Sequence, residues 1–312
     1  MAVAKKAAKV AENPTSSKTS KGQGKVVKVE KTVKAPKVVE PKKDLPAQAG
    51  KVAKVVEKID PTTPKATLGA QKEAKVSVEF ESLPSLKDML EAGVHFGHSI
   101  KRRNPRMDDF VYAVKNGVQI FDLVQTRKAL SDACNYIVDV VANGGQILLV
   151  GTKAQAAETI KSEAERLGVA FMTTHWVGGL FTNWEMLHTR VDKLVDMKKK
   201  YEAGEYKKYT KKEQVLLKRE IDRLERMYGG LVTLKGLPKV VFIVDPTREI
   251  TAMRESSHRE IPVVAIVDTN GDPTGIAHVI PANDDALKSV VMLVTAVTAA
   301  VEKGLKLNKE RK

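Results

Sequence analysis

Apolar positions beyond about residue 82 follow two alternating periods. Short, mostly apolar runs occur at 146–150, 169–173, 240–244, 263–267 and 278–280. Between them, apolar residues recur every three or four positions, which is the period of an amphipathic helix. Continuous apolar strands that alternate with helices are typical of a parallel sheet covered on both faces. The pattern therefore predicts a three-layer, doubly wound α/β fold.

Turn and capping residues indicate where the expected elements begin and end. Ser85 can cap a short helix over Leu86–Leu90 that stops at Gly93. Asn116-Gly117 separates two short apolar runs, which is the strongest local signal for a β-hairpin. Further helices are expected over 124–141, 155–167 and 249–256, and a last one from a cap at Asn283–Asp285 to Gly304.

One long segment interrupts the alternation of strands and helices. Leu187, Val191 and Leu194 are spaced by four and three residues, and the apolar positions from Leu217 to Leu231 continue this heptad spacing after a polar turn. Two such helices predict an antiparallel coiled-coil hairpin, inserted at about residues 184–230. The hairpin is too polar to cover the sheet, so it is expected to project from the domain.

Residues 1–80 differ in composition from residues 81–312, which we expect to form the α/β domain. They hold 18 Lys, no Arg and 8 acidic residues, and therefore +10 of the formal net charge of +15. A segment this charged and this poor in large apolar side chains cannot offset its ordering entropy, so disorder is predicted. Two interpretations stay open: a salt-sensitive tether to RNA, and a solvated extension without a specific partner.

Cysteine content and hydropathy indicate in which cellular compartment the protein is expected. The single cysteine, Cys134, excludes a disulfide within the chain, which suits a reducing compartment such as the cytoplasm. Cys134 lies in an apolar helical pattern and is expected to be buried. No run approaches the roughly 18 apolar residues of a membrane span, and the N-terminus lacks the apolar core of a secretory signal. We expect no membrane partner.

Doubly wound sheets often bind nucleotides at the carboxyl ends of their strands, so an enzyme is the main alternative. The candidate phosphate loop is Gly151–Lys153, directly after the first core strand. The chain contains neither G-x-G-x-x-G nor G-x-x-x-x-G-K-[ST], which favours a plain strand-to-helix turn. Asp245 and Asp268 end apolar strands, as catalytic acids often do, but turn residues follow each of them.

Two groups of residues could bind a metal ion. His95 and His98 are three residues apart, but Gly93 and Gly97 indicate irregular backbone there, and no Cys or carboxylate lies close in the sequence. Histidines that pack or form hydrogen bonds are the favoured interpretation. Asn283–Asp285 could bind a cation, but a helix N-cap with acids near the helix dipole explains this run without one.

Two basic clusters are candidate contacts to phosphate. Lys101, Arg102, Arg103 and Arg106 lie within six residues and are interrupted by Pro105, so they cannot form the solvated face of a helix. Arginine adds planar, bidentate phosphate recognition, and we interpret this loop as an RNA contact. The tip of the hairpin carries a second cluster, for which an RNA contact and a merely solvated face both stay open: Lys207, Lys208, Lys211 and Lys212.

Several runs occur in the order known from one protein family. They are Met89–His98, Asn104–Met107, Asn116–Leu123, Val141–Gly145, Val150–Lys153, Trp176–Asn183, Val244–Pro246, Ile261–Asn270 and Ile280–Ala286. In this succession, from about Leu86 to Gly304, the chain resembles the family of the second small-subunit ribosomal protein (ribosomal protein S two). The hairpin makes it similar to the bacterial branch of that family.

The resemblance implies a fold, a role and partners. The family fold is a flavodoxin-like parallel sheet with an inserted coiled-coil hairpin. Its members are structural constituents of the small ribosomal subunit that lie between head and body. They contact small-subunit ribosomal RNA and help to recruit the first small-subunit ribosomal protein. The resemblance therefore implies a cytoplasmic, ribosome-bound protein without enzymatic activity, cofactor or small-molecule substrate.

Some positions depart from the family pattern. Arg103 stands where a Trp often precedes the Asn-Pro pair, Thr174-His175 replace a typical Gln-Arg, and Ala282 stands where Gly is common. The Lys-rich segment lies outside the family core, so the resemblance implies nothing about it. Two other functions stay open as alternatives: a nucleotide-binding α/β enzyme, and a coiled-coil adaptor that binds only proteins.

Overall fold

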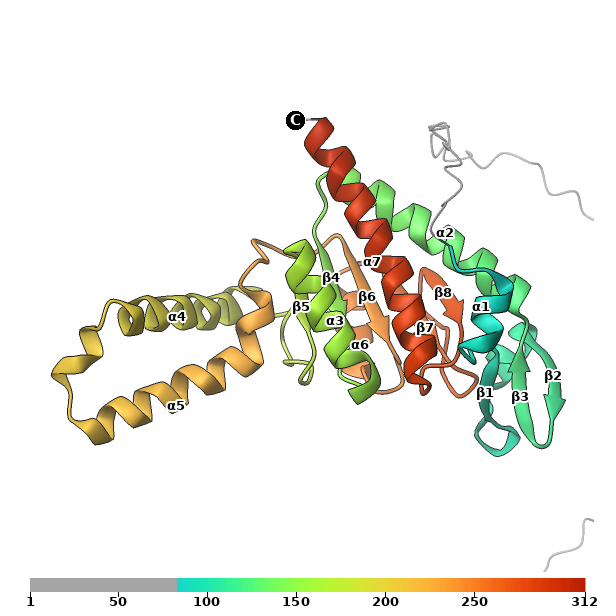
Figure 1. Ribbon diagram of the computed structural model, residues 1–312, viewed down its shortest axis with the longest axis horizontal. Coiled ribbons are helices and arrows are strands. Elements are labelled where there is room, and N and C mark those ends of the chain that lie inside the picture. Colours follow the sequence, from blue (N-terminus) through green and yellow to red (C-terminus); the bar gives the residue numbers. More distant parts are fainter. Residues whose placement is uncertain (1–82, 312) are drawn as a thin grey trace, which may run out of the picture. The chain divides into compact units, whose positions relative to one another are not determined.

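The computed structural model describes residues 83–311, so the predicted disordered segment 1–80 lies outside the described residues (Figure 1). The main sheet has five strands in the order β5-β4-β6-β7-β8, and all neighbouring pairs are parallel. The α/β fold with a parallel sheet is thereby confirmed. The strands are β4 (Ile147–Val150), β5 (Ala170–Met172), β6 (Val240–Val244), β7 (Val263–Val267) and β8 (His278–Pro281).

Both faces of this sheet are buried, which explains why its strands are apolar at consecutive positions. Every residue of β4, β6 and β7 is buried. Successive side chains of a strand point to opposite faces of the sheet, so both faces must be covered. One face packs against α2 (Leu123–Ala142), α3 (Ala154–Leu167) and α7 (Leu287–Glu310). The other packs against α6 (Ile250–His258), the segment before residue 184 and the base of the hairpin.

Single elements of the core follow their local signals. Ser85 caps α1 (Leu86–Glu91) in a reciprocal capping box with Asp88. Cys134 is fully buried in α2, as expected, and burial raises the pKa of its thiol to about 12. Among residues 83–311, no helix is both long and apolar enough to cross a membrane.

A second, three-stranded antiparallel sheet has the order β1-β3-β2. Asn116 and Gly117, both at positive φ, form the predicted turn of its hairpin. The irregular backbone expected at His95–His98 is present within a short strand, because β1 pairs Phe96 with Ile120 but its register with β3 shifts between Phe96 and Ser99. Gly97 also serves close packing, since a Cβ there would lie 2.6 Å from the Thr269 side chain. The strands are β1 (Phe96–Ser99), β2 (Val111–Lys115) and β3 (Val118–Phe121).

The segment between β5 and β6 forms two long helices that pack against each other, α4 (Trp184–Glu202) and α5 (Lys211–Tyr228). A short 3-10 helix, η3 (Glu205–Lys208), joins them at the tip, and η4 (Gly229–Leu231) follows α5. Figure 1 shows this hairpin in yellow, extending away from the layers that cover the sheet. Apolar heptad positions such as Leu194 and Leu224 are buried between its helices, as the spacing predicts.

The last helix departs from its prediction at both ends. Its N-cap is Ala286 and not the run Asn283–Asp285, because the Asn283 side chain accepts the backbone N–H groups of Asp285 and Ala286 in a preceding turn. Gly304 does not end the helix, which continues to Glu310. Gly304 is a packing residue, since a Cβ there would lie 2.8 Å from the Cβ of Val141 on α2.

This close approach of α7 to α2 predicts the effect of one methyl group. We expect Gly304→Ala to lower the free energy of unfolding by about 1–3 kcal/mol, because overpacking outweighs the better helix propensity of alanine. Urea denaturation followed by circular dichroism measures the change. Gly178→Ala, which would meet no atom within 4 Å, is the matched control. An unchanged or raised stability of Gly304→Ala would contradict the packing role.

Candidate functional site

The basic loop at residues 100–106 is fixed to the segment that follows β7. It contains two 3-10 helices, η1 (Ile100–Arg102) and η2 (Pro105–Phe110). Between them, the Asn104 backbone N–H donates to the Thr269 carbonyl at 2.8 Å, and its side-chain amide donates to the Gly271 carbonyl at 2.7 Å. The loop therefore has a defined position above the carboxyl end of the sheet.

The four cations of this loop have different surroundings. Arg106 Nη1 lies 2.8 Å from Asp272 Oδ2 and donates to Thr274 Oγ1 as well, so it ties the loop to residues 272–274. Arg103 Nη2 lies 3.2 Å from Asp108. Lys101 and Arg102 are exposed and have no ion pair among residues 83–311. The structure thus divides the predicted cluster into two paired arginines and two cations that face solvent.

The second predicted cluster lies at the hairpin tip. Its two pairs are Lys207 and Lys208 in η3, and Lys211 and Lys212 in the first turn of α5, all exposed and none in an ion pair within the described part of the chain. Thr210 caps α5 in a capping box with Glu213. Lysines in the first turn of a helix face the positive end of its dipole, which disfavours the helix. Helix stability therefore does not explain these cations.

The two clusters lie toward opposite edges of the parallel sheet and form separate surfaces. The 100–106 loop contacts the segment after β7, and β7 lies next to the edge strand β8. The hairpin follows β5, which is the other edge strand. The structure does not bring the eight predicted residues together into one site. Any RNA that contacts both must extend across the domain.

At the carboxyl end of the sheet, Lys153 is neutralised by the chain itself. Its Nζ lies 2.8 Å from Asp284 Oδ1, 2.5 Å from Asp285 Oδ1 and 3.8 Å from Asp245 Oδ2. Burial would lower the pKa of Lys153, but the carboxylates of Asp284 and Asp285 outweigh burial and raise it. A lysine held by three carboxylates offers no free cation to a phosphate group.

The glycine of this loop also has a structural explanation. A Cβ at Gly151 would lie 2.3 Å from Ile160 Cδ1 on α3, so glycine is needed for the helix to pack against the strand end. Thr152 donates a hydrogen bond to the buried Glu249 carboxylate. Gly151–Lys153 is therefore a strand-to-helix turn, and the enzyme alternative loses its candidate phosphate loop.

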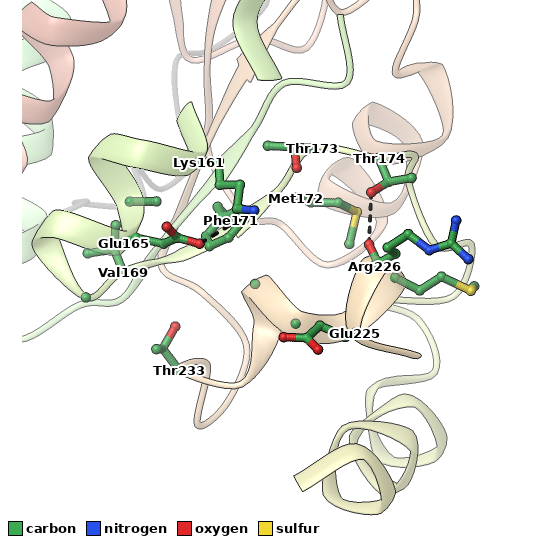
Figure 2. Close-up of a pocket in the computed structure, with 15 residues that line it drawn as sticks. Lys161, Glu165, Val169, Phe171, Met172, Thr173, Thr174, Glu225, Arg226 and Thr233 are labelled. Atoms are coloured by element: carbon green, nitrogen blue, oxygen red, sulfur yellow. Dashed lines mark hydrogen bonds and ion pairs between the residues drawn. The ribbon is translucent and has the colours of Figure 1, made fainter. Parts of the chain in front are cut away.

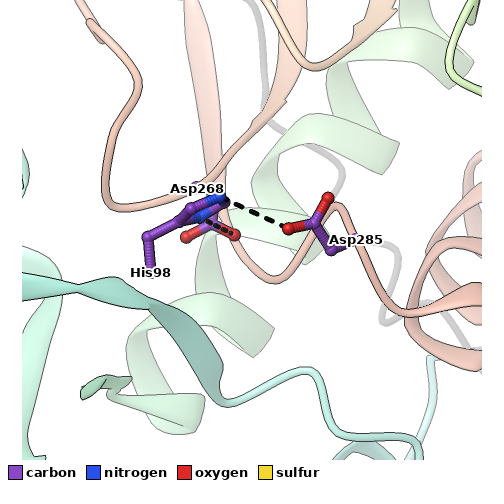
Figure 3. Close-up of side chains that lie close together, drawn as sticks. All are labelled: His98, Asp268 and Asp285. Carbon is purple, nitrogen blue, oxygen red and sulfur yellow. Dashed lines mark ion pairs between the residues drawn. The ribbon is translucent and has the colours of Figure 1, made fainter. Parts of the chain in front are cut away.

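The fold assembles a candidate metal centre that the sequence did not reveal. His98, Asp268 and Asp285 each offer a ligand atom, and these atoms all lie within 4.8 Å of one another (Figure 3). His98 Nδ1 lies 3.0 Å from Asp268 Oδ2 without an aligned hydrogen bond, and Nε2 lies 3.3 Å from Asp285 Oδ2. The carboxylates come from segments 170 or more residues away, so no local spacing could indicate them.

The charges around His98 favour a cation. The Asp268 carboxylate raises the pKa of His98, and burial together with Asp245 raises the pKa of Asp284 to about 7. Asp245, Asp268, Asp284 and Asp285 face Lys153 and His98. The pKa of Asp285 is lowered chiefly by Lys153 and also by His98 and Arg102, so Arg102 contributes charge to this cluster as well. One imidazole with two carboxylates suits Zn²⁺ better than Mg²⁺, which prefers oxygen ligands alone.

This arrangement predicts zinc binding that depends on His98. We expect micromolar Zn²⁺ to raise the thermal unfolding midpoint and a chelator to reverse the rise, because the ion binds the folded state alone. The effect should weaken as the pH falls, since a proton on the imidazole competes with the ion. His98→Ala should abolish the shift, whereas His258→Ala, which alters an exposed histidine on α6, should keep it. Equal shifts in both variants would refute the site.

A buried carboxylate positions the base of the hairpin. Glu255 on α6 accepts hydrogen bonds from Trp176 Nε1 at 3.0 Å, from the backbone N–H of Gly179 at 2.7 Å and from that of Phe181 at 2.9 Å. Burial would raise the pKa of Glu255, but these hydrogen bonds outweigh it and lower the pKa. The loop that Glu255 holds leads directly into α4, so this clamp sets where the hairpin begins.

These hydrogen bonds predict that replacing the Glu255 carboxylate lowers the stability in a pH-dependent way. We expect Glu255→Gln to lower the free energy of unfolding by about 2–4 kcal/mol near neutral pH, because an amide cannot accept all these donors. A lowered pKa means that the stabilisation is present above the unfolded pKa of about 4.3 and is lost as the pH falls through the folded value. Urea denaturation at several pH values should show the difference from wild type shrinking in acid. Glu158→Gln, an exposed change on α3, should cost little at any pH.

A pocket of about 500 Å³ lies at the base of the hairpin, between α3, β5 and η4 (Figure 2). Its charged side chains are of both signs, and Lys161 pairs with Glu165 at 4.0 Å. Thr174, one of the departures from the family pattern, donates from Oγ1 to the Arg226 carbonyl at 2.9 Å. Because acidic and basic side chains both line this pocket, it offers no clear preference for a phosphate group.

The comparison with protein families agrees with the order of motifs along the chain. A family model described as Ribosomal protein S2 matches residues 89–304, which is more than half of the chain. The match spans both sheets, the 100–106 loop and the hairpin. The chain belongs to the ribosomal protein S2 family, and is a structural, non-enzymatic protein of the small ribosomal subunit.

Proposed function

We propose that the protein docks on small-subunit ribosomal RNA through two basic surfaces, the 100–106 loop and the hairpin tip. Family membership supports ribosomal RNA and ribosomal proteins as partners. The observation that carries the assignment of these surfaces is the clustering of exposed cations, without ion pairs to any of residues 83–311, on the 100–106 loop and at the hairpin tip. Within these two clusters they are Lys101, Arg102, Lys207, Lys208, Lys211 and Lys212.

The paired arginines support the first surface in a different way. Arg106 and Arg103 hold the loop through Asp272 and Asp108, so Lys101 and Arg102 stand on a fixed backbone. A cation that is already positioned loses less entropy when it meets a phosphate. Each contact releases counterions from the RNA, which makes the affinity depend on salt. Arg103 and Arg106 remain within reach of the same phosphates because both are exposed.

We also propose a more specific fold for the domain. Counted along the chain, the parallel strands lie in the order 2-1-3-4-5, which supports a flavodoxin-like doubly wound fold. Heptad spacing and the buried seam between α4 and α5 support a coiled-coil hairpin as the insertion. Such a hairpin carries the second basic surface away from the sheet.

We also propose the first small-subunit ribosomal protein as a neighbour in the assembled subunit. Support for this partner comes from the family motifs along the chain and from the family match over residues 89–304. The test adds the purified first protein to small subunits that contain or lack this chain. Co-sedimentation measures how much of the first protein binds in each case. If the first protein joined subunits equally well in both cases, the proposed contact would be wrong.

The division of the loop cations predicts different effects for neighbouring residues. We expect Lys101→Ala with Arg102→Ala to weaken binding to small subunits depleted of this protein, and to lower the salt slope of RNA binding by about 2, one unit per cation. Arg106→Ala should lower the stability by no more than about 1 kcal/mol, because its ion pair with Asp272 is exposed and Asp272 keeps its hydrogen bonds from Thr274. Filter binding and co-sedimentation over a range of salt concentrations measure both effects.

The matched control for this variant lies on α2. Arg127 and Lys128 are adjacent, exposed and outside both surfaces, so changing them to Ala removes the same charges elsewhere. Equal losses in the two double variants would mean that binding follows net charge alone. No loss in Lys101→Ala with Arg102→Ala would reject the loop as an RNA contact.

A further inference from the structure

The tip of the hairpin encloses a pocket that the basic cluster alone does not explain. Its volume is about 520 Å³, within the usual range for sites that hold a small ligand. The pocket lies where α4 ends, η3 turns and α5 begins. Two aromatic rings and three lysines account for most of its wall, which is lined by Tyr201, Gly204, Tyr206, Lys207, Lys211, Gln214, Val215 and Lys218.

The aromatic rings offer faces for stacking. Tyr201 is 45% exposed, although a ring of this size usually gains stability from burial. Its centroid lies 6.3 Å from that of Tyr206, and the two planes meet at 54°, so the rings form a corner and do not stack on each other. Tyr209 continues the row at 6.1 Å from Tyr206. A planar ligand can therefore lie against the exposed Tyr201 ring.

The charges of the pocket select an anion. Lys207, Lys211 and Lys218 have no ion pair among residues 83–311, and no acidic residue lines the pocket. The nearby Glu213 accepts hydrogen bonds from Thr210 in the helix cap and is occupied there. Three cations beside the exposed Tyr201 ring and the half-buried Tyr206 ring match a ligand with phosphates and planar bases.

The backbone holds this wall in place. Gly204 has φ +72° and begins the turn into η3, a conformation that favours glycine. Gln214 Nε2 donates to the Tyr209 carbonyl at 2.9 Å and links the first turns of α5 to the turn. The pocket is thus part of the folded tip, and an incoming group would meet a formed surface.

We propose that the hairpin tip binds an unpaired nucleotide of single-stranded RNA, with its base stacked on Tyr201 beside Tyr206 and its phosphates against Lys207, Lys211 and Lys218. A base within a duplex is already stacked and paired, so it cannot enter, whereas a loop or bulge presents free bases. Aromatic stacking accepts any base, so the pocket selects single strands and not a sequence. This inference rests on the proposed RNA-docking function and specifies the RNA structure that the tip takes.

The test uses the full chain and a short single-stranded RNA that carries the fluorescent base 2-aminopurine. Stacking on an aromatic ring quenches this base, whereas residues 1–79, which contain no aromatic side chain, can bind phosphates without quenching it. We expect quenching with the single strand and not with a duplex of the same sequence. Tyr201→Leu should lower the affinity measured by quenching by about 5- to 150-fold, the range for one stacked base.

Three further variants separate stacking from charge and from loss of structure. Tyr201→Phe keeps the ring and should keep the quenching. Tyr112→Leu, at an exposed tyrosine on β2, should have no effect. Lys211→Ala should keep the quenching but lower the salt slope by about 0.7, as expected for one phosphate contact on a single strand.

Two results would overturn the proposal: quenching of the same strength in Tyr201→Leu, or equal quenching with the duplex of the same sequence. The proposed function is judged separately by Lys101 and Arg102. If their variant still weakened association with small subunits while Tyr201→Leu had no effect, RNA docking would stand and the stacking pocket would fall. The reverse pattern would support the pocket and reject the loop.

Discussion

The ion pairs of Lys153 hold together the carboxyl end of the sheet. This one ammonium group, which follows β4, contacts Asp245 after β6 and both aspartates that precede α7. Asp285 also faces His98, so the same cluster reaches the small antiparallel sheet. A buried charge is tolerated only when it is paired, and removal of one partner is costly because the others stay desolvated. In nucleotide-binding proteins with a doubly wound sheet the strand ends bind a ligand, but here the chain's own charges occupy them.

Because charged side chains of the chain itself fill the carboxyl end of the sheet, the proposed RNA-binding residues lie outside the sheet. Two sets of polar contacts position the segments that carry these residues. Asn104 and Arg106 fix the 100–106 loop to the segment after β7, and Glu255 fixes the loop from which the hairpin starts. In both cases the clamping groups are paired within the fold, while neighbouring cations stay exposed to solvent. Part of the charge of the described domain is therefore used in ion pairs within the fold, and part stays exposed, where we propose that it contacts RNA.

The hairpin shows the same division along one element. Its base is apolar and continuous with the core on one face of the sheet, whereas its tip combines lysines with partly exposed tyrosines. Lysines at the start of α5 oppose the helix dipole, and an exposed Tyr201 forgoes burial. These residues reduce the stability of the tip, and the packed seam between α4 and α5 offsets that loss. A hairpin with a stable base can therefore carry such a tip without lowering the stability of the domain.

The sequence by itself determined the elements whose signals are local. Apolar runs and heptads predicted the strands, most helices and the hairpin, because period and capping act within a few residues. It also marked both basic clusters and, through the order of its motifs, the family. Only the tertiary structure decided what depends on distant contacts. Strand β1 exists because Phe96 pairs with Ile120, Gly304 lies within α7 because α2 crosses there, and Arg106 belongs to Asp272. Likewise, His98 meets Asp268 and Asp285 only after folding, because residues so far apart in the chain leave no spacing to recognise.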